Sequence, residues 1–196
     1  IAGDPVQVLQ RAVASVDASL PPTLGNHFCV VQLSTGDGTA DVIQIAPGQR
    51  AAPNLTAMLA DPSILKLFHF ARFDLAVLRN AFGVMPSPVY CTKIASRLTR
   101  TYTDRHGLKD ITRELLSVDL SKQQQSSDWA AETLTDAQLA YAASDVLHLH
   151  ALKAKFDVML ARENRTALAE ACFRFLPTRS QLDLDGWPDT DIFAHS

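Results

Sequence analysis

The sequence has little cysteine, no strong excess of either charge and no long apolar run. Its three cysteines (Cys29, Cys91 and Cys172) are far apart and form no Cys-x-x-Cys pair, which indicates buried thiols in a reducing cytoplasm and excludes a disulfide framework or a cysteine-rich zinc site. No run of about 18 apolar residues is present, so no membrane-spanning helix is expected. We expect no export signal either, because the first residues lack a basic segment followed by an apolar one. The net charge of −3 argues against a protein that tracks long duplex nucleic acid.

What is present predicts one α/β domain over residues 1–196. The chain is 47% hydrophobic, enough for a full core. Strands are expected at residues 28–33, 40–45, 64–70 and 88–92. Helices are expected at residues 4–15, 73–82, 93–100, 108–116, 134–156 and 166–175. This order, a short helix and a hairpin followed by strand–helix alternation, predicts a mixed sheet flanked by helices.

The predicted helix at residues 134–156 carries the most informative pair of side chains. Thr135 followed by Gln138 is typical of a capping box at a helix start. Apolar residues then recur at intervals of three and four: Leu139, Ala142, Val146, Leu149 and Phe156. A spacing of four places Tyr141 and Asp145 on one face. A carboxylate there can bind a hard cation while the phenol orients a water, although such pairs are more often ordinary surface residues.

A second group of candidate residues lies at 69–74, His-Phe-Ala-Arg-Phe-Asp. Asp74 follows a predicted strand at a strand-to-helix junction, where α/β sheets usually expose functional groups. In isolation, Asp74 is more typical of a helix cap and His69 of a hydrogen-bonded edge histidine. In combination with Tyr141 and Asp145, however, Asp74 supplies what a divalent-metal site needs, namely oxygen ligands from different rigid elements.

These segments resemble a known family. The stretches HFARFD, KQQQSSDW and YAASDVLHL resemble, in this order, the ribonuclease D branch of the DEDD 3′–5′ exonucleases, in its tyrosine-containing (DEDDy) subclass. More narrowly, residues 29–196 resemble the bacterial nanoRNase C proteins. The resemblance implies a ribonuclease-H-like fold and release of nucleoside 5′-monophosphates from the 3′ ends of short oligoribonucleotides, including dinucleotides, by a mechanism with two Mg²⁺ or Mn²⁺ ions. It also implies assembly as a ring-like homo-oligomer. DNA ends are a further candidate substrate, and the preference between RNA and DNA stays open.

The resemblance assigns roles to individual residues. It makes Asp74 and Asp145 metal ligands and Tyr141 the residue that orients the attacking water. Substrate-contacting side chains are expected from His69, Phe70, Phe73, Leu20 and Leu24. The net +3 charge of residues 93–122, seven basic against four acidic residues, suggests a phosphate-facing or subunit-facing role for part of this segment, although many such runs are only solvated. The C-terminal residues 177–196 are expected to dock on the fold or on a neighbouring subunit.

The first family motif is degenerate at residues 16–25. Family members carry Asp-x-Glu on the first strand, whereas here Asp17, as metal ligand and catalytic residue, is followed by Ser19 at the glutamate position. A second register places Leu20 and Pro22 there. A missing carboxylate predicts weaker metal binding and a rate lower by about 10²-fold.

Three explanations for the missing glutamate stay open. The protein is catalytically impaired and acts as a nucleotide-binding scaffold, another acid such as Asp4 completes the site, or this stretch differs from that of the natural protein. A phosphohydrolase acting on mononucleotides is a further alternative. The sequence alone does not choose among them.

Overall fold

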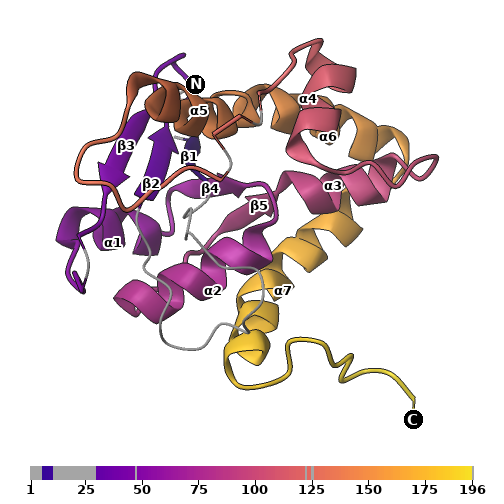
Figure 1. Cartoon of the computed structure of the whole chain (residues 1–196). Helices are drawn as coiled ribbons and strands as arrows, with labels where there is room; N and C mark the ends of the chain where they lie inside the picture. Colours follow the sequence, from indigo (N-terminus) through magenta and orange to yellow (C-terminus); the bar gives the residue numbers. More distant parts are fainter. Residues whose placement is uncertain (1–5, 11–29, 47, 122, 125, 196) are drawn as a thin grey trace.

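A five-stranded mixed sheet forms the centre of the protein (Figure 1). The structure, a computed structural model, describes residues 6–10, 30–46, 48–121, 123–124 and 126–195. The strands are β1 (Val6–Gln10), β2 (Val30–Ser34), β3 (Asp41–Gln44), β4 (Leu65–Phe68) and β5 (Val89–Cys91). Their spatial order is β3-β2-β1-β4-β5, in which β1 pairs antiparallel with β2 and parallel with β4. The prediction of a mixed α/β sheet is confirmed.

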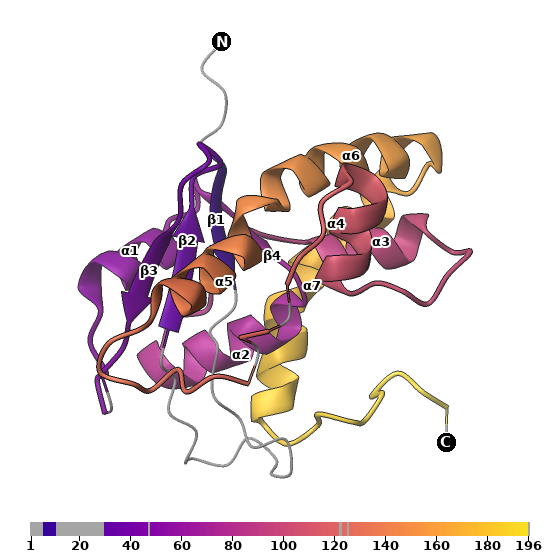
Figure 2. The ribbon, with the colours of Figure 1, turned by 45° about the horizontal axis from the view of Figure 1, so that its top comes forward.

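Seven helices surround the sheet in the described part of the chain. They are α1 (Pro53–Ala60), α2 (Ala71–Phe82), α3 (Thr92–Thr99), α4 (Leu108–Leu116), α5 (Asp136–Leu147), α6 (Leu149–Arg162) and α7 (Thr166–Leu184). Helix α5 packs across β1, β2 and β3, whereas α6 contacts β1, β4 and the helices α3 and α4. Figure 2 shows α5 crossing in front of the strands. None of the described helices is long and apolar enough to cross a bilayer.

The prediction of a helix at residues 4–15 is wrong for residues 6–10. These residues form β1, the middle strand of the sheet. The spacing of Val6 and Leu9 matches a helical repeat, but five residues carry too little pattern to separate the two periods. The backbone of β1 hydrogen-bonds to a strand on each side, and this pairing outweighs local preference.

The predicted helix at residues 134–156 is two helices, with His148 at the junction. The capping box of Thr135 and Gln138 is confirmed at the start of α5. Leu139, expected on the apolar face, is 38% exposed, while Ala142 and Val146 are fully buried. Since no Gly or Pro occurs near His148, the sequence contains no signal for the break.

Three smaller expectations need correction. Helix α1 was missed, although Pro53 opens it and Leu55 and Leu59 bury one face. Helix α7 runs to Leu184, so residues 177–184 are helical and the tail begins only at Asp185. Among the cysteines, Cys91 is buried as expected, but Cys172 is partly exposed and Cys29 lies outside the described residues.

Lys66 in β4 ties two loops together from inside the core. Its side chain is fully buried, and its Nζ donates hydrogen bonds to the backbone oxygens of Asp61 and of Ser87, the latter at 2.9 Å. We expect Lys66→Met to lower the free energy of unfolding by about 2–3 kcal/mol, because it leaves carbonyl groups without their donor. Urea unfolding measures this change, with exposed Lys155→Met as the control. An equal effect of both substitutions would contradict this role of Lys66.

Candidate active site at the β4–α2 junction and helix α5

Asp74 lies in the first turn of α2, immediately after β4. The chain passes from Phe68 into this helix through Phe70, which has the left-handed backbone angles φ 73° and ψ 43°. Such a conformation is costly for a residue with a bulky side chain and is most often retained at functional sites. The turn buries Asp74, whose exposed fraction is 1%. A carboxylate is therefore held inside the protein at the carboxyl end of a parallel strand.

Helix α5 carries the second pair of candidate residues. Asp145 is 7% exposed, and Tyr141, one turn earlier, is partly buried. The Tyr141 ring packs at 5.8 Å from that of the fully buried Trp129, in a cluster with Val30 and Ala142. Trp129, the last residue of KQQQSSDW, thus serves as a packing anchor. This packing fixes the side of α5 from which Tyr141 and Asp145 project.

Strand register brings the two groups to one edge of the sheet. Val8 of β1 pairs with both Ser34 of β2 and Leu67 of β4. Because β2 is antiparallel and β4 parallel to β1, the start of β2 lies at the same edge as the end of β4. Val30, which begins β2 and packs in the Tyr141 cluster, therefore lies near the level at which β4 passes into α2. The cluster that contains Tyr141 and the Asp74 turn of α2 thus lie at the same edge of the sheet.

Side chains that follow β4 and β5 frame this edge. His69 Nδ1 lies 2.9 Å from Thr92 Oγ1, and the Thr92 hydroxyl donates to the Phe68 oxygen at 3.2 Å. Phe70 is 45% exposed, and Lys93 Nζ lies 4.2 Å from the centroid of its ring. Phe73, by contrast, is partly buried. Sequence reasoning missed Thr92 and named Lys93 only as part of the basic segment 93–122. The position of both residues directly after β5, a strand parallel to β4, could have revealed them.

The residues at this edge suit a hard divalent cation. Asp74 and Asp145 offer buried carboxylate oxygens, the ligands that Mg²⁺ and Mn²⁺ prefer. Within the described residues, no group of three His, Cys, Asp or Glu side chains lies close enough to hold a metal. The expected third ligand, Asp17, and the expected substrate contacts Leu20 and Leu24 lie outside the described residues. The carboxylate oxygens therefore fit Mg²⁺ or Mn²⁺, and two of the three proposed ligands, Asp74 and Asp145, lie within the described residues.

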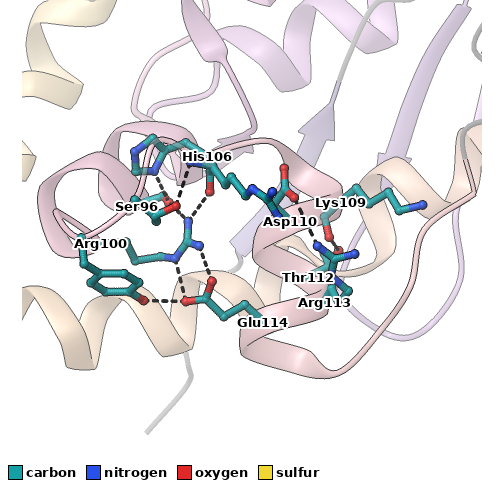
Figure 3. A network of polar contacts seen from close by, with 11 residues as sticks. Ser96, Arg100, His106, Lys109, Asp110, Thr112, Arg113 and Glu114 are labelled. Carbon is teal, nitrogen blue, oxygen red and sulfur yellow. Dashed lines mark hydrogen bonds and ion pairs between the residues drawn. The ribbon is translucent and has the colours of Figure 1, made fainter.

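The basic segment 93–122 is partly neutralised by its own acids (Figure 3). Arg100 is 1% exposed, and its guanidinium binds the Glu114 carboxylate through two nitrogens, Ser96 Oγ at 2.9 Å and the Arg105 oxygen at 2.6 Å. Arg100 is therefore a structural residue that joins α3 to α4, and its charge does not face solvent.

His106 belongs to the same network and makes the stability of the protein depend on pH. Its Nδ1 lies 2.9 Å from Ser96 Oγ, and burial, then the charges of Arg100 and Arg97, lower its pKa below the usual 6.5. The folded state thus binds this proton more weakly than the unfolded state, so stability falls as the pH drops below about 6.5. We expect the free energy of unfolding of His106→Asn, measured with urea, to fall less between pH 7 and pH 5 than that of the unaltered protein. His195→Asn, in the exposed tail, is the control and is expected to follow the unaltered protein. Parallel pH profiles for the unaltered protein and His106→Asn would contradict this assignment.

Comparison with known proteins finds similarity over most of the chain. A family model described as a 3′–5′ exonuclease matches residues 18–161. The ribonuclease D of Gluconacetobacter diazotrophicus is 36% identical over 139 residues, which cover 71% of this chain and 35% of the relative. The chain thus spans about a third of the length of that curated relative.

Solved structures extend the similarity to the whole fold. Brucella melitensis NrnC is 63% identical, with a TM-score of 0.92 over 98% of this chain and 91% of the other. That protein has also been solved with bound Mg²⁺ and bound to pGG. Escherichia coli RNase D is 28% identical, with a TM-score of 0.78 over 94% of this chain and 48% of the other. The ribonuclease-H-like exonuclease fold implied by the sequence is confirmed.

Proposed function

Because this chain belongs to the ribonuclease D-like 3′–5′ exonucleases, we propose that it hydrolyses short oligoribonucleotides, dinucleotides included, from the 3′ end to nucleoside 5′-monophosphates. The observation that carries the proposal is that the Asp74 turn of α2 and the cluster containing Tyr141 lie at the same edge of the sheet. The similarity over nearly its full length to a nuclease that has been solved with pGG supports the choice of a short substrate.

The proposed mechanism assigns each side chain one task. Asp74 and Asp145, with Asp17, would hold two Mg²⁺ or Mn²⁺ ions, which when bound neutralise charge on the scissile phosphate and on the leaving 3′ oxygen. The Tyr141 hydroxyl positions the water that attacks phosphorus. We assign base stacking to Phe70, which is solvent-exposed, and further substrate contacts to Phe73 and His69.

Tyr141→Phe separates water positioning from metal binding. The substitution removes only the hydroxyl, so we expect the rate to fall by about 10-fold to 10³-fold while Mn²⁺ affinity changes little. Dinucleotide turnover measured beside calorimetric titration of Mn²⁺ checks both expectations. Tyr102→Phe is the control, because Tyr102 is exposed and does not belong to the candidate site. Loss of metal binding in Tyr141→Phe would show that the tyrosine has a different role.

Three labelled substrates identify the reaction class. A 5′-labelled dinucleotide, a longer RNA and a nucleoside monophosphate are incubated with Mg²⁺, with Mn²⁺ and with EDTA. The proposal predicts cleavage of the dinucleotide and shortening of RNA from the 3′ end, both abolished by EDTA. If phosphate is released from the nucleoside monophosphate and neither RNA substrate is cleaved, the protein is instead a mononucleotide phosphohydrolase. A DNA strand with the same sequence as the RNA tests the proposed action on DNA ends.

The similarity to nanoRNase C proteins also supports assembly as a ring-like homo-oligomer, which we include in the proposal. Light scattering coupled to size exclusion measures the mass of the particle in solution. A mass equal to that of one chain would contradict this part.

One observation favours a second function, that of a nucleotide-binding scaffold. The first strand of the sheet, Val6–Gln10, has the sequence VQVLQ and contains no acid, whereas family members carry Asp-x-Glu on this strand. Asp17 lies seven positions beyond the end of that strand. Retention of a labelled dinucleotide without cleavage in both metals would favour the scaffold.

A further inference from the structure

The first turn of α2, which carries Asp74, is fastened to the end of α7 through Arg72. Arg72 Nε donates to Asp183 Oδ2 at 2.6 Å, and Nη2 donates to Oδ1 at 2.7 Å, so the contact is a bidentate ion pair. The two residues are 111 positions apart in the sequence. Bidentate arginine–carboxylate pairs fix orientation as well as distance, because both groups are planar.

Two further contacts join the same elements. Ser180 of α7 is fully buried, and its hydroxyl donates to the backbone oxygen of Arg72 at 2.9 Å. Asp183 is held in turn by Arg179, whose Nη2 lies 2.8 Å from Oδ1. The α7 side of the contact is thereby fixed independently of Arg72.

The C-terminal tail closes over this ion pair. Arg72 Nη2 also donates to the backbone oxygen of Pro188, which accepts a second hydrogen bond from Arg179 Nη2 at 2.9 Å. Arg179 Nη2 further reaches the backbone oxygen of Trp187 at 2.7 Å. The contacts place the end of α7 and the start of the tail against the turn that holds Asp74, and both views show α7 beside α2 (Figures 1 and 2).

We propose that Arg72, Ser180 and Asp183 form a clamp that positions the Asp74 carboxylate and thereby sets the metal affinity of the site. Asp74 lies two residues after Arg72 in the same helical turn, so rotation or fraying of this turn moves its carboxylate directly. Groups that orient metal ligands without touching the metal commonly matter for affinity. The inference rests on the proposed function, because it assumes that Asp74 binds a divalent ion.

Asp183→Asn tests the clamp in the full-length protein. The substitution keeps the shape of the side chain but removes the charge that holds Arg72. We expect faster amide hydrogen exchange in residues 71–75 of the metal-free protein, and Mn²⁺ binding weaker by about 10-fold to 100-fold in calorimetric titration. Asp183→Glu, which restores a carboxylate, is expected to recover part of both losses.

Glu163→Gln is the matched control, since it breaks a surface ion pair with Arg162 on α6. We expect it to change neither quantity. Ser180→Ala repeats the test with a smaller perturbation, and about 3-fold weaker Mn²⁺ binding is expected from the loss of one hydrogen bond. This second variant keeps the test valid if Asp183→Asn does not fold.

The outcomes separate the inference from the proposed function. If the unaltered protein binds Mn²⁺ and both clamp variants bind it equally well, the clamp is only structural and the inference is wrong. The same conclusion follows if exchange in residues 71–75 rises while metal affinity stays unchanged. If the unaltered protein binds no Mn²⁺ at all, the metal site fails and the inference fails with it.

Discussion

Asp145→Asn is expected to reduce metal-dependent dinucleotide hydrolysis by about 10³-fold or more, with the fold unchanged. The substitution replaces an anionic oxygen by an amide of the same shape at a position that is 7% exposed. Loss of one charged group at a catalytic centre has effects of this order. Asp74→Asn is expected to behave alike, because its carboxylate belongs to the same proposed metal site.

Asp136→Asn is the control for the Asp145 variant. Asp136 is exposed and lies in the first turn of the same helix, so its substitution removes an equal charge without touching the site. Rates are measured with 5′-labelled dinucleotide in Mn²⁺, and thermal unfolding checks the fold of each variant. A near-normal rate for Asp145→Asn would remove Asp145 from the active site.

Ser19→Glu is expected to increase both Mg²⁺ affinity and dinucleotide hydrolysis, the latter by about 10²-fold. If Asp17 and Ser19 stand at the first family motif, as the resemblance implies, the substitution supplies the carboxylate that this motif lacks. The gain should be larger in Mg²⁺ than in Mn²⁺, because Mg²⁺ demands near-octahedral oxygen coordination and dehydrates reluctantly. Calorimetric titration with each metal, beside turnover of a dinucleotide, provides the measurement.

Ser15→Glu, four positions earlier in the same segment, is the control for added charge. If Ser19→Glu changes nothing while the unaltered protein already turns over efficiently, another acid completes the site. In that case the assignment of Asp17 and Ser19 to the first motif is wrong.

The sequence predicts strands β2 to β5 and most of the helices because their patterns are local. Strand β2 lies in a mainly apolar run, and the residues of α4 were predicted to their ends. Strand β1 was missed because its stability comes from pairing with β2 and β4, and these partners cannot be recognised from five residues. The packing changes at His148, because α5 lies across β1, β2 and β3 whereas α6 contacts mainly α3 and α4.

The residues of the candidate site could be predicted from the sequence, but the contacts and backbone conformation that hold them could not. Asp74, Tyr141 and Asp145 follow from motif spacing, and the structure places them on the elements expected. The clamp of Arg72 with Asp183 was not predictable, because the two residues come from distant elements and no local pattern joins them. The left-handed backbone of Phe70 was equally hidden, since phenylalanine rarely adopts it.

The most direct test of the central claim is hydrolysis of 5′-labelled pGG by the unaltered protein, with Mn²⁺ and with excess EDTA. The account predicts labelled nucleoside 5′-monophosphate in Mn²⁺ and none in EDTA. The account would be contradicted if the unaltered protein binds pGG in Mn²⁺ without cleaving it and Ser19→Glu does not cleave it either.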